Sequence, residues 1–301
     1  MNVRGEPVRP VPDQVVLVTG ATDGLGKAVA RELASRRATV LLHGRDQARG
    51  EAALSEIRQA TGNDRLRLYL ADFSSLAQVR RLADAILAGT ERLDLLINNA
   101  GVGGRSPRQE SQDGHELRFA VNYLAPFLLT HLLLPLLRRS APARIVNVAS
   151  AGQAPIDFDD VMLTRAYEPL HAYRQSKLAQ IMHTFELAER LRAQGETHVT
   201  VNALHPASLM PTKMVFEMFG APMSTLEEGT EATLHLAISP DLDGVTGRYF
   251  NGLREARALE QAYDPEARRR LWAISEQLCG LAGTAPTDVP PGHRPSRRGG
   301  S

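Results

Sequence analysis

The chain has 301 residues, with 35 Lys and Arg against 34 Asp and Glu and a formal net charge of +1 at pH 7. This length can bury the core of one large α/β domain or of two small ones. The balanced charge argues against nucleic acid or another polyanion as a partner, and the single cysteine, Cys279, excludes an intramolecular disulfide.

Two segments bear on targeting. Residues 1–13 contain Arg and Pro but no apolar run, so they predict a flexible lead-in and not a secretory signal. Residues 119–137 are almost long and apolar enough for a membrane span, but they contain Asn122, Pro126, His131 and Pro135. A helix buried inside a soluble protein or at a subunit interface explains them better. We therefore expect no membrane span and a cytoplasmic location.

The first strand–turn–helix pattern is rich in glycine. Val15–Val18 is a short β-branched run, typical of a strand buried on both faces, and helical periodicity begins at Lys27. Glycines allow a tight turn and close approach to a ligand, and the start of a helix favours a phosphate. The turn predicts a site for the pyrophosphate of a dinucleotide, the alternative being a tight turn without a ligand. The candidate residues are Gly20, Thr22, Asp23, Gly24, Leu25 and Gly26.

The choice of cofactor depends on the residues just after the second predicted strand, 39–42. Asp46 could hold the ribose hydroxyls of NAD, or it could cap the next predicted helix, residues 47–61. Arg45 could instead pair with the 2′-phosphate of NADP, for which a guanidinium is suited. We favour Arg45, and so NADP(H) over NAD(H), with the reservation that Asp23 would oppose a 2′-phosphate if it faced that group.

The remaining pattern alternates strands and helices at near-constant spacing, which indicates a parallel sheet covered on both faces. The fold class is α/β, a doubly wound Rossmann-type sheet of about seven strands in three α/β/α layers. Residues 14–283 are expected to form one domain, and residues 284–301 a disordered tail. Further strands are predicted at 66–71, 93–97, 144–148, 197–204 and 247–250, and further helices at 76–88, about 119–137, about 171–193, 227–238 and 265–281.

Ligand sites in such sheets gather at the carboxyl ends of strands. Asn99, Ala100 and Gly101 come after the fourth predicted strand, Ser150 comes after the fifth, and Pro206 comes after the sixth. The next segment, about 207–224, is apolar, rich in Met and broken by Pro and Gly. It predicts a mobile substrate lid, with a core-packing helix as the alternative.

Tyr173 and Lys177 are four residues apart in a predicted helix, so their side chains share one face. A phenol is a poor base at neutral pH, and a nearby positive charge favours the phenolate. The pair is therefore a candidate acid/base site, although Tyr and Lys on a solvated helix face would show the same spacing.

The combined motifs resemble those of the short-chain dehydrogenase/reductase family. They are T-G-x-x-x-G-x-G, N-N-A-G, an Asn in the apolar helix, a Ser after the fifth strand and Y-x-x-x-K, in that order. Three further segments are similar to the branch that contains the retinol dehydrogenases. They are R-I-V-N-V-A-S at 144–150, I-D-F-D-D at 156–160 and A-Y-R-Q-S-K-L-A at 172–179.

The resemblance implies an NAD(P)-dependent oxidoreductase acting on the carbonyl/alcohol pair of an apolar small molecule. It implies that Tyr173 exchanges a proton with the substrate oxygen and that Ser150 hydrogen-bonds the same oxygen. Lys177 would hold the nicotinamide ribose and depress the pKa of the phenol, and Asn122 would anchor a water in a proton relay. The cofactor would also be held by Asn99, Ala100, Gly101 and Pro206, and its adenine would meet Asp72.

Two other readings of the motifs remain. A catalytically silent dinucleotide-binding protein, regulatory or scaffolding, could share the fold without the chemistry. A sugar-nucleotide epimerase or dehydratase on the same fold is disfavoured by the glycine spacing and by the absence of a separate substrate domain. No metal site is expected. The apolar helix and the Tyr173 helix could form the two-fold contacts of a homodimer or homotetramer, and a monomer is equally consistent.

Overall fold

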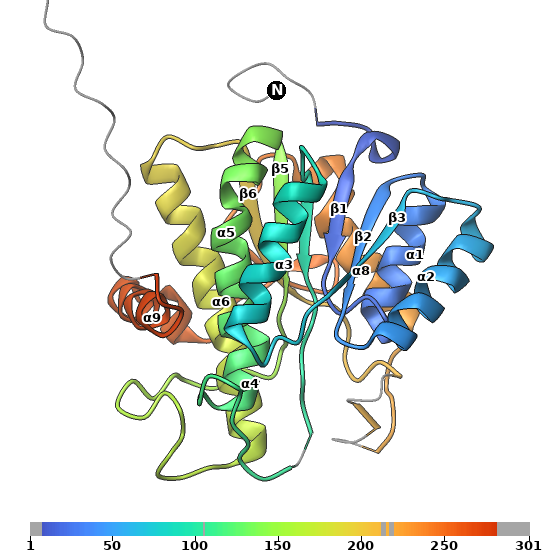
Figure 1. Cartoon of the computed structure of the whole chain (residues 1–301). Coiled ribbons are helices and arrows are strands. Elements are labelled where there is room, and N and C mark those ends of the chain that lie inside the picture. The colour runs from blue at the N-terminus through green and yellow to red at the C-terminus, as the bar shows by residue number, and fades with distance from the viewer. Residues whose placement is uncertain (1–7, 105, 212–214, 217–219, 282–301) are drawn as a thin grey trace, which may run out of the picture.

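An eight-stranded sheet forms the middle layer of the protein, in a computed structural model that describes residues 8–104, 106–211, 215–216 and 220–281 (Figure 1). The strand order is β3-β2-β1-β4-β5-β6-β7-β8, and every pairing is parallel except that of β7 with β8. The strands are β1 (Val15–Val18), β2 (Thr39–Gly44), β3 (Leu66–Leu70), β4 (Leu95–Asn98), β5 (Ala143–Val148), β6 (Val199–His205), β7 (Tyr249–Asn251) and β8 (Arg254–Glu255). The predicted doubly wound α/β fold is confirmed, and the two-residue β8 adds one strand to the seven expected.

Helices cover both faces of the sheet (Figure 1). One face carries α1 (Gly24–Ser35), α2 (Gln47–Thr61) and α8 (Leu226–Ile238). The other face carries α3 (Leu76–Gly89), α5 (Ala125–Ser140) and α6 (Pro169–Ala193), with α9 (Pro265–Leu278) beside α6. Shorter elements are η1 (Val11–Asp13), α4 (Leu117–Phe119), the π-helix η2 (Ala120–Leu124), η3 (Pro240–Leu242) and η4 (Glu260–Tyr263).

The apolar run in β1 is a consequence of this layering. Val16 and Val18 pack in the core under α1 and α8, whereas Leu17 packs in the core under α3, α5 and α6. All three side chains are fully buried. A strand covered on both faces needs an apolar side chain at each position, so a continuous run replaces the alternation of a half-exposed strand.

The order of the strands reverses at β1, which lies between β2 and β4. The chain moves outward from β1 to β3 and then returns to place β4 on the other side of β1. Such a reversal leaves a crevice at the carboxyl ends of the two strands, which is where ligands bind in open α/β sheets. The fold therefore places the site at the end of β1 and β4.

The long apolar helix is a core element. The helical stretch Leu117–Ser140 is the one described stretch with the length and composition of a membrane span, and its most apolar window has a mean hydropathy of 1.6 and is 83% buried. Packing against the sheet and α3 explains its composition.

The helix α9 covers part of the surface that we expected could form a two-fold contact. The Trp272 ring lies 5.1 Å from that of Phe127 on α5, and the Arg190 guanidinium of α6 lies 4.1 Å over Trp272. A contact between two chains through this part of α5 and α6 would require α9 to move.

Three predicted segments lie partly or wholly outside the described residues. These are the start of the lead-in (1–7), parts of the lid (212–214 and 217–219) and the tail (284–301). Within the lead-in, Arg9 donates hydrogen bonds to Asp94 at 3.2 Å and to the Ser140 carbonyl at 2.8 Å. Arg9, which we expected in a loose segment, is therefore held against the end of the sheet.

Candidate active site

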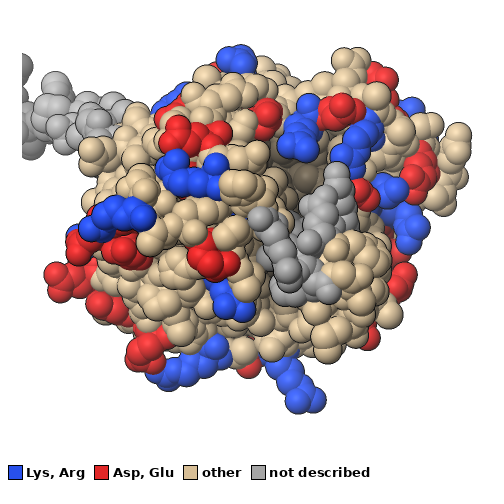
Figure 2. Space-filling model, turned by 90° about the horizontal axis from the view of Figure 1, so that it is seen from below, with Lys and Arg blue, Asp and Glu red and all other residues tan. Residues whose placement is uncertain are grey.

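A cavity of about 820 Å³ opens at the carboxyl ends of the strands. Figure 2 views the protein from this side and shows the hollow, with basic and acidic side chains gathered beside it. Almost every residue predicted from the sequence lines the cavity, and Asn122 is the exception. The predicted lining residues are Gly20, Thr22, Asp23, Gly24, Leu25, Gly26, Arg45, Asp72, Asn99, Ala100, Gly101, Ser150, Tyr173, Lys177 and Pro206.

The glycine turn between β1 and α1 is tightly packed. Gly20 has φ +65° and Gly24 has φ +49°, in the left-handed region that favours glycine. A Cβ on Gly26 would lie 2.2 Å from the Gly20 carbonyl oxygen and 2.4 Å from the Asn99 side-chain nitrogen. No larger residue fits at Gly26 without moving backbone, so the glycine spacing reflects the close packing of this turn on the strand beside it.

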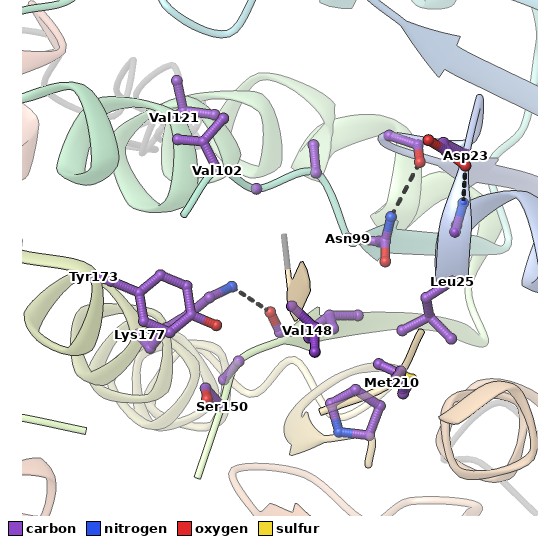
Figure 3. Close-up of a pocket in the computed structure, with 18 of the residues that line it drawn as sticks. Asp23, Leu25, Asn99, Val102, Val121, Val148, Ser150, Tyr173, Lys177 and Met210 are labelled. Atoms are coloured by element: carbon purple, nitrogen blue, oxygen red, sulfur yellow. Dashed lines mark hydrogen bonds between the residues drawn. The ribbon is translucent and has the colours of Figure 1, made fainter. Parts of the chain in front are cut away.

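Thr19 and Asn99 fasten the turn to the end of β4. The Thr19 hydroxyl accepts hydrogen bonds from the backbone N–H groups of Asn99 and Ala100, at 2.9 and 3.0 Å. The Asn99 side chain donates to the Thr19 carbonyl at 2.9 Å and to the Gly20 carbonyl at 3.2 Å. Figure 3 shows Asn99 beside the glycine turn, with one of these bonds drawn. Asn99 is thus mainly a support for the glycine turn. The threonine that begins the T-G-x-x-x-G-x-G motif was not among the predicted site residues.

His43 is a second residue that sequence reasoning left without a role. The Gly20 N–H donates to its Nδ1 at 3.2 Å, and its Nε2 lies 3.0 Å from the Ala71 carbonyl, so hydrogen bonding assigns the proton to Nε2. Burial lowers the pKa of His43 to about 4, against a smaller opposing effect of the Ala71 hydrogen bond. His43 is therefore a neutral link between the glycine turn and the end of β3.

The acids near Arg45 are both engaged as helix caps. Asp46 accepts a hydrogen bond from the Arg49 backbone N–H at 2.8 Å and caps α2. Asp23 accepts from the Gly24 N–H at 2.8 Å, capping α1, and its other oxygen pairs with the Arg49 guanidinium at 2.9 Å. Arg49 lines the same cavity and was not predicted. The negative charge of Asp23 is thus balanced by Arg49.

Asp72 lies at the same end of the cavity, after β3. Its carboxylate accepts a hydrogen bond from the Ser74 N–H at 2.9 Å. Phe73 is the next residue, and the Phe73 ring stacks on His43 at 4.3 Å. These contacts hold the loop after β3 against the end of β2.

The other end of the cavity brings Ser150, Tyr173 and Lys177 together (Figure 3). Ser150 lies just beyond β5, and its hydroxyl accepts the Gly152 N–H at 3.0 Å. Lys177 Nζ lies 5.7 Å from the centre of the Tyr173 ring, and donates to the Val148 carbonyl at 3.0 Å and to the Gln180 side-chain oxygen at 2.9 Å. The helix spacing thus brings the ammonium beside the phenol. Gln180, which holds Lys177, was not predicted.

The pKa shifts at this end differ from the expected depression of the phenol. Burial raises the pKa of Tyr173, and a hydrogen bond with Ser150 only partly offsets this. Burial also lowers the pKa of Lys177 to about 7, so this lysine is not a full positive charge at neutral pH. Low polarity around both groups disfavours both charged forms. Depression of the phenol's pKa by Lys177 together with the charge of the oxidised nicotinamide stays a prediction.

Asn122 lies behind the cavity wall, fully buried in the π-helix η2. Its side chain accepts the Val102 N–H at 2.7 Å and donates to the Val102 carbonyl at 3.0 Å and the Ser176 hydroxyl at 2.9 Å. A Cβ on Gly101 would lie 3.2 Å from the Asn122 oxygen and 3.6 Å from Lys177 Nζ. Asn122 therefore holds the backbone that separates it from Lys177. Its part in a proton relay stays a prediction.

The residues present fit a nicotinamide dinucleotide. The glycine turn and the start of α1 offer backbone N–H groups to a pyrophosphate, as in other dinucleotide sites. Arg45 and Asp72 line the cavity on the side of β2 and β3, and Tyr173 and Lys177 line it on the side of β5. The two ends would hold the adenosine and the nicotinamide halves.

Comparisons with known proteins agree with this geometry. Residues 14–220 match the family model for short chain dehydrogenases. Retinol dehydrogenase 13 of Mus musculus is 40% identical over 289 residues, which cover 90% of this chain and 85% of the mouse protein.

Solved structures give the same result. An uncharacterized protein from Mycobacterium paratuberculosis has a TM-score of 0.73 and 32% identity, covering 89% of this chain and 94% of its own. A short-chain dehydrogenase from Escherichia coli, complexed with NADPH, has a TM-score of 0.66 and 27% identity, covering 83% of this chain and 100% of its own. The chain belongs to the short-chain dehydrogenase/reductase family, in its retinol dehydrogenase-like branch, and is an NAD(P)-dependent oxidoreductase.

Proposed function

We propose that the protein is an NADP(H)-dependent reductase of apolar aldehydes or ketones, with Tyr173 as the general acid. The observation that carries this proposal is the meeting of Ser150, Tyr173 and Lys177 at one end of the dinucleotide-sized cavity. NADPH, held by the glycine turn, Arg45 and Lys177, would supply a hydride to the carbonyl carbon. The carbonyl oxygen takes a proton, and the product is an alcohol.

Tyr173 is suited to supply that proton. Because its pKa is raised, the phenol is protonated at neutral pH, which is the form that reduction requires. The Ser150 hydroxyl accepts the Gly152 N–H, and this contact leaves its own hydrogen available to donate to the same carbonyl oxygen. A donor aimed at the oxygen stabilises the negative charge that develops there. We propose that Lys177 binds the nicotinamide ribose through a donor that Val148 and Gln180 orient.

Two contacts support NADP(H) over NAD(H). Asp46 caps α2 through one carboxylate oxygen, which accounts for an acid at this position without a ribose ligand. Asp23 is paired with Arg49, which reduces its opposition to a phosphate, and the Arg45 guanidinium at the cavity wall has no ion pair among the described residues. A 2′-phosphate would meet one unpaired arginine and one balanced ion pair.

The walls beside Tyr173 support an apolar substrate. Val102, Leu117, Val121 and Leu170 line this end, together with Val215 and Met223 from the described part of the expected lid. A mouse relative is named for retinol, which is an apolar primary alcohol. We propose a small apolar carbonyl compound, handled in the cytoplasm.

Replacing Tyr173 by Phe tests the proposal. Tyr173→Phe should bind NADPH as the wild type does and lose reductase activity by about 10²- to 10⁴-fold, the usual contribution of a general acid. The measurement is the loss of NADPH absorbance with a panel of aldehydes and ketones, beside NADPH binding by fluorescence. Equal turnover by the two proteins would refute the role of Tyr173, and tight NADPH binding without any turnover by the wild type would favour a silent binding protein.

A further inference from the structure

We propose that Arg174 binds a carboxylate carried by the substrate, so that the preferred substrates are oxo acids with an apolar body. The proposal rests on the reductase function above and narrows its substrate class. It is carried by the position of Arg174, by its lack of a partner in the described residues and by the distribution of charge around the cavity.

Arg174 is the residue after Tyr173 on α6 and lines the cavity. Its Cγ and Nε lie 3.7 and 3.9 Å from the place that a Cβ on Gly152 would take, and the Ser150 hydroxyl lies 3.5 Å from the same place. The arginine stem therefore runs along Gly152, next to the hydroxyl that would meet the reacting oxygen. An anionic group on the substrate could reach the guanidinium while its carbonyl sits at Ser150 and Tyr173.

The Arg174 guanidinium is free to take a ligand. It is exposed, and its side chain has no hydrogen bond or ion pair within the described part of the chain. Its neighbours on the same helix face are Leu170, His171 and Leu178, with Lys177 one turn ahead, so no acid is placed to pair with it. The nearest acid that precedes it on the chain, Glu168, caps α6 through the N–H groups of Leu170 and His171.

Charge is divided between the two ends of the cavity. The described lining residues include three acids, Asp23, Asp46 and Asp72, all at the end that would hold the adenosine. The end that contains Tyr173 is lined by Arg174, Lys177 and His205 with apolar side chains between them. This end thus has no carboxylate among its described lining residues and combines the charge of Arg174 with apolar walls. A planar guanidinium can bind a carboxylate through two parallel hydrogen bonds, which makes an oxo acid a better match than a neutral carbonyl compound.

The test compares acids with their esters. The probes are ω-oxo carboxylic acids of graded length, from four to twelve carbons, and their methyl esters, because the spacing from carbonyl to carboxylate is set by the chain length. The wild type should prefer the acid over its ester in kcat/KM by about five- to thirtyfold at the best length, as expected for a charged hydrogen bond weakened by solvent. Arg174→Gln should bring this ratio close to one, and Arg174→Lys should give an intermediate ratio.

Arg192→Gln is the matched control, since Arg192 is exposed on the same helix and does not line the cavity. It should keep the acid-to-ester ratio of the wild type. An equal use of acid and ester by the wild type, or the same preference in Arg174→Gln, would overturn the role of Arg174 while leaving the reductase function in place.

A binding measurement separates this proposal from the function on which it rests. Acid and ester are titrated calorimetrically into the NADPH complex of Tyr173→Phe, with and without Arg174→Gln. Acid-selective binding that needs Arg174, without turnover of any probe by the wild type, would support the carboxylate site and refute the reductase. Binding of the acid that does not depend on Arg174 would refute the carboxylate site.

Discussion

The charge on Lys177 is held by two hydrogen bonds, and removing one of them should change its pKa by a predictable amount. Lys177 is buried, and burial lowers its pKa to about 7. Its Nζ donates to the Val148 carbonyl and to the Gln180 side chain, at 3.0 and 2.9 Å. Gln180→Leu removes the second acceptor with little change in volume. A hydrogen bond to a charged group contributes about 1.5–3 kcal/mol, which is about one to two pKa units, so the pKa of Lys177 should fall to about 5–6.

The sequence makes this shift easy to observe. Lysine occurs only at Lys27, Lys177 and Lys213, so lysine labelled with ¹³C at Cε gives few NMR signals to track in a pH titration. Lys27, which pairs with Glu56 on the surface at 2.9 Å, is an internal control. Gln180→Glu is the opposite variant, because a carboxylate beside Lys177 favours the ammonium and should raise its pKa.

The same shift sets the direction of the effect on cofactor binding. A lower pKa leaves less ammonium at neutral pH. If the ammonium holds the nicotinamide ribose, the dissociation constant of NADPH from Gln180→Leu should be higher at pH 7 than at about pH 5.5. The dissociation constant of the wild type should change less over the same range. A wild-type Lys177 that titrates near its ordinary pKa, or the same midpoint in wild type, Gln180→Leu and Gln180→Glu, would show that burial and Gln180 do not set its charge.

Two further predictions concern the cofactor and acid stability. Arg45→Ala should weaken NADPH binding by about tenfold or more and leave NADH binding unchanged, and an equal loss of both cofactors would contradict the 2′-phosphate assignment. Asp46→Ala should lower the free energy of unfolding by about 1 kcal/mol through loss of the α2 cap, and should keep the ratio of the NADPH and NADH dissociation constants. Burial lowers the pKa of His183 to about 3, and its Nε2 has no hydrogen-bond partner among the described residues. As the pH drops from about 6.5 toward 3, this histidine takes up a proton in the unfolded chain but not in the folded one. The free energy of unfolding should therefore fall over this range, by up to about 5 kcal/mol. His183→Leu should therefore unfold at a lower pH than the wild type in a circular dichroism titration, with His235→Leu, a partly exposed position on α8, as control; equal acid midpoints would refute this origin of acid sensitivity.

The sequence by itself determined the layer architecture and most of the cavity lining. Periodicity and β-branched runs located the seven parallel strands, and the central ones are apolar throughout because they are covered on both faces. The glycine spacing located the turn after β1, since Gly26 has backbone within 2.2 Å of any Cβ. Tyr173 and Lys177 meet because four residues make about one helical turn. These features depend on local geometry, and local geometry can be read from spacing.

Tertiary structure decided what the local pattern left open. Asp46 was consistent with a ribose ligand and with a helix cap, and the hydrogen bond from the Arg49 N–H shows that it caps α2. His43 carries no motif, and its contact with Gly20 exists because the ends of β1 and β2 lie side by side. Gln180 is within local reach of Lys177 on α6, but the burial that makes this hydrogen bond matter comes from the fold. The pKa directions of Tyr173 and Lys177 also came from the fold, since desolvation depends on how many atoms surround a group. Spacing along the chain determines which residues are neighbours on one element, whereas burial and partners across elements are set by packing, and the charges at this site are a result of packing.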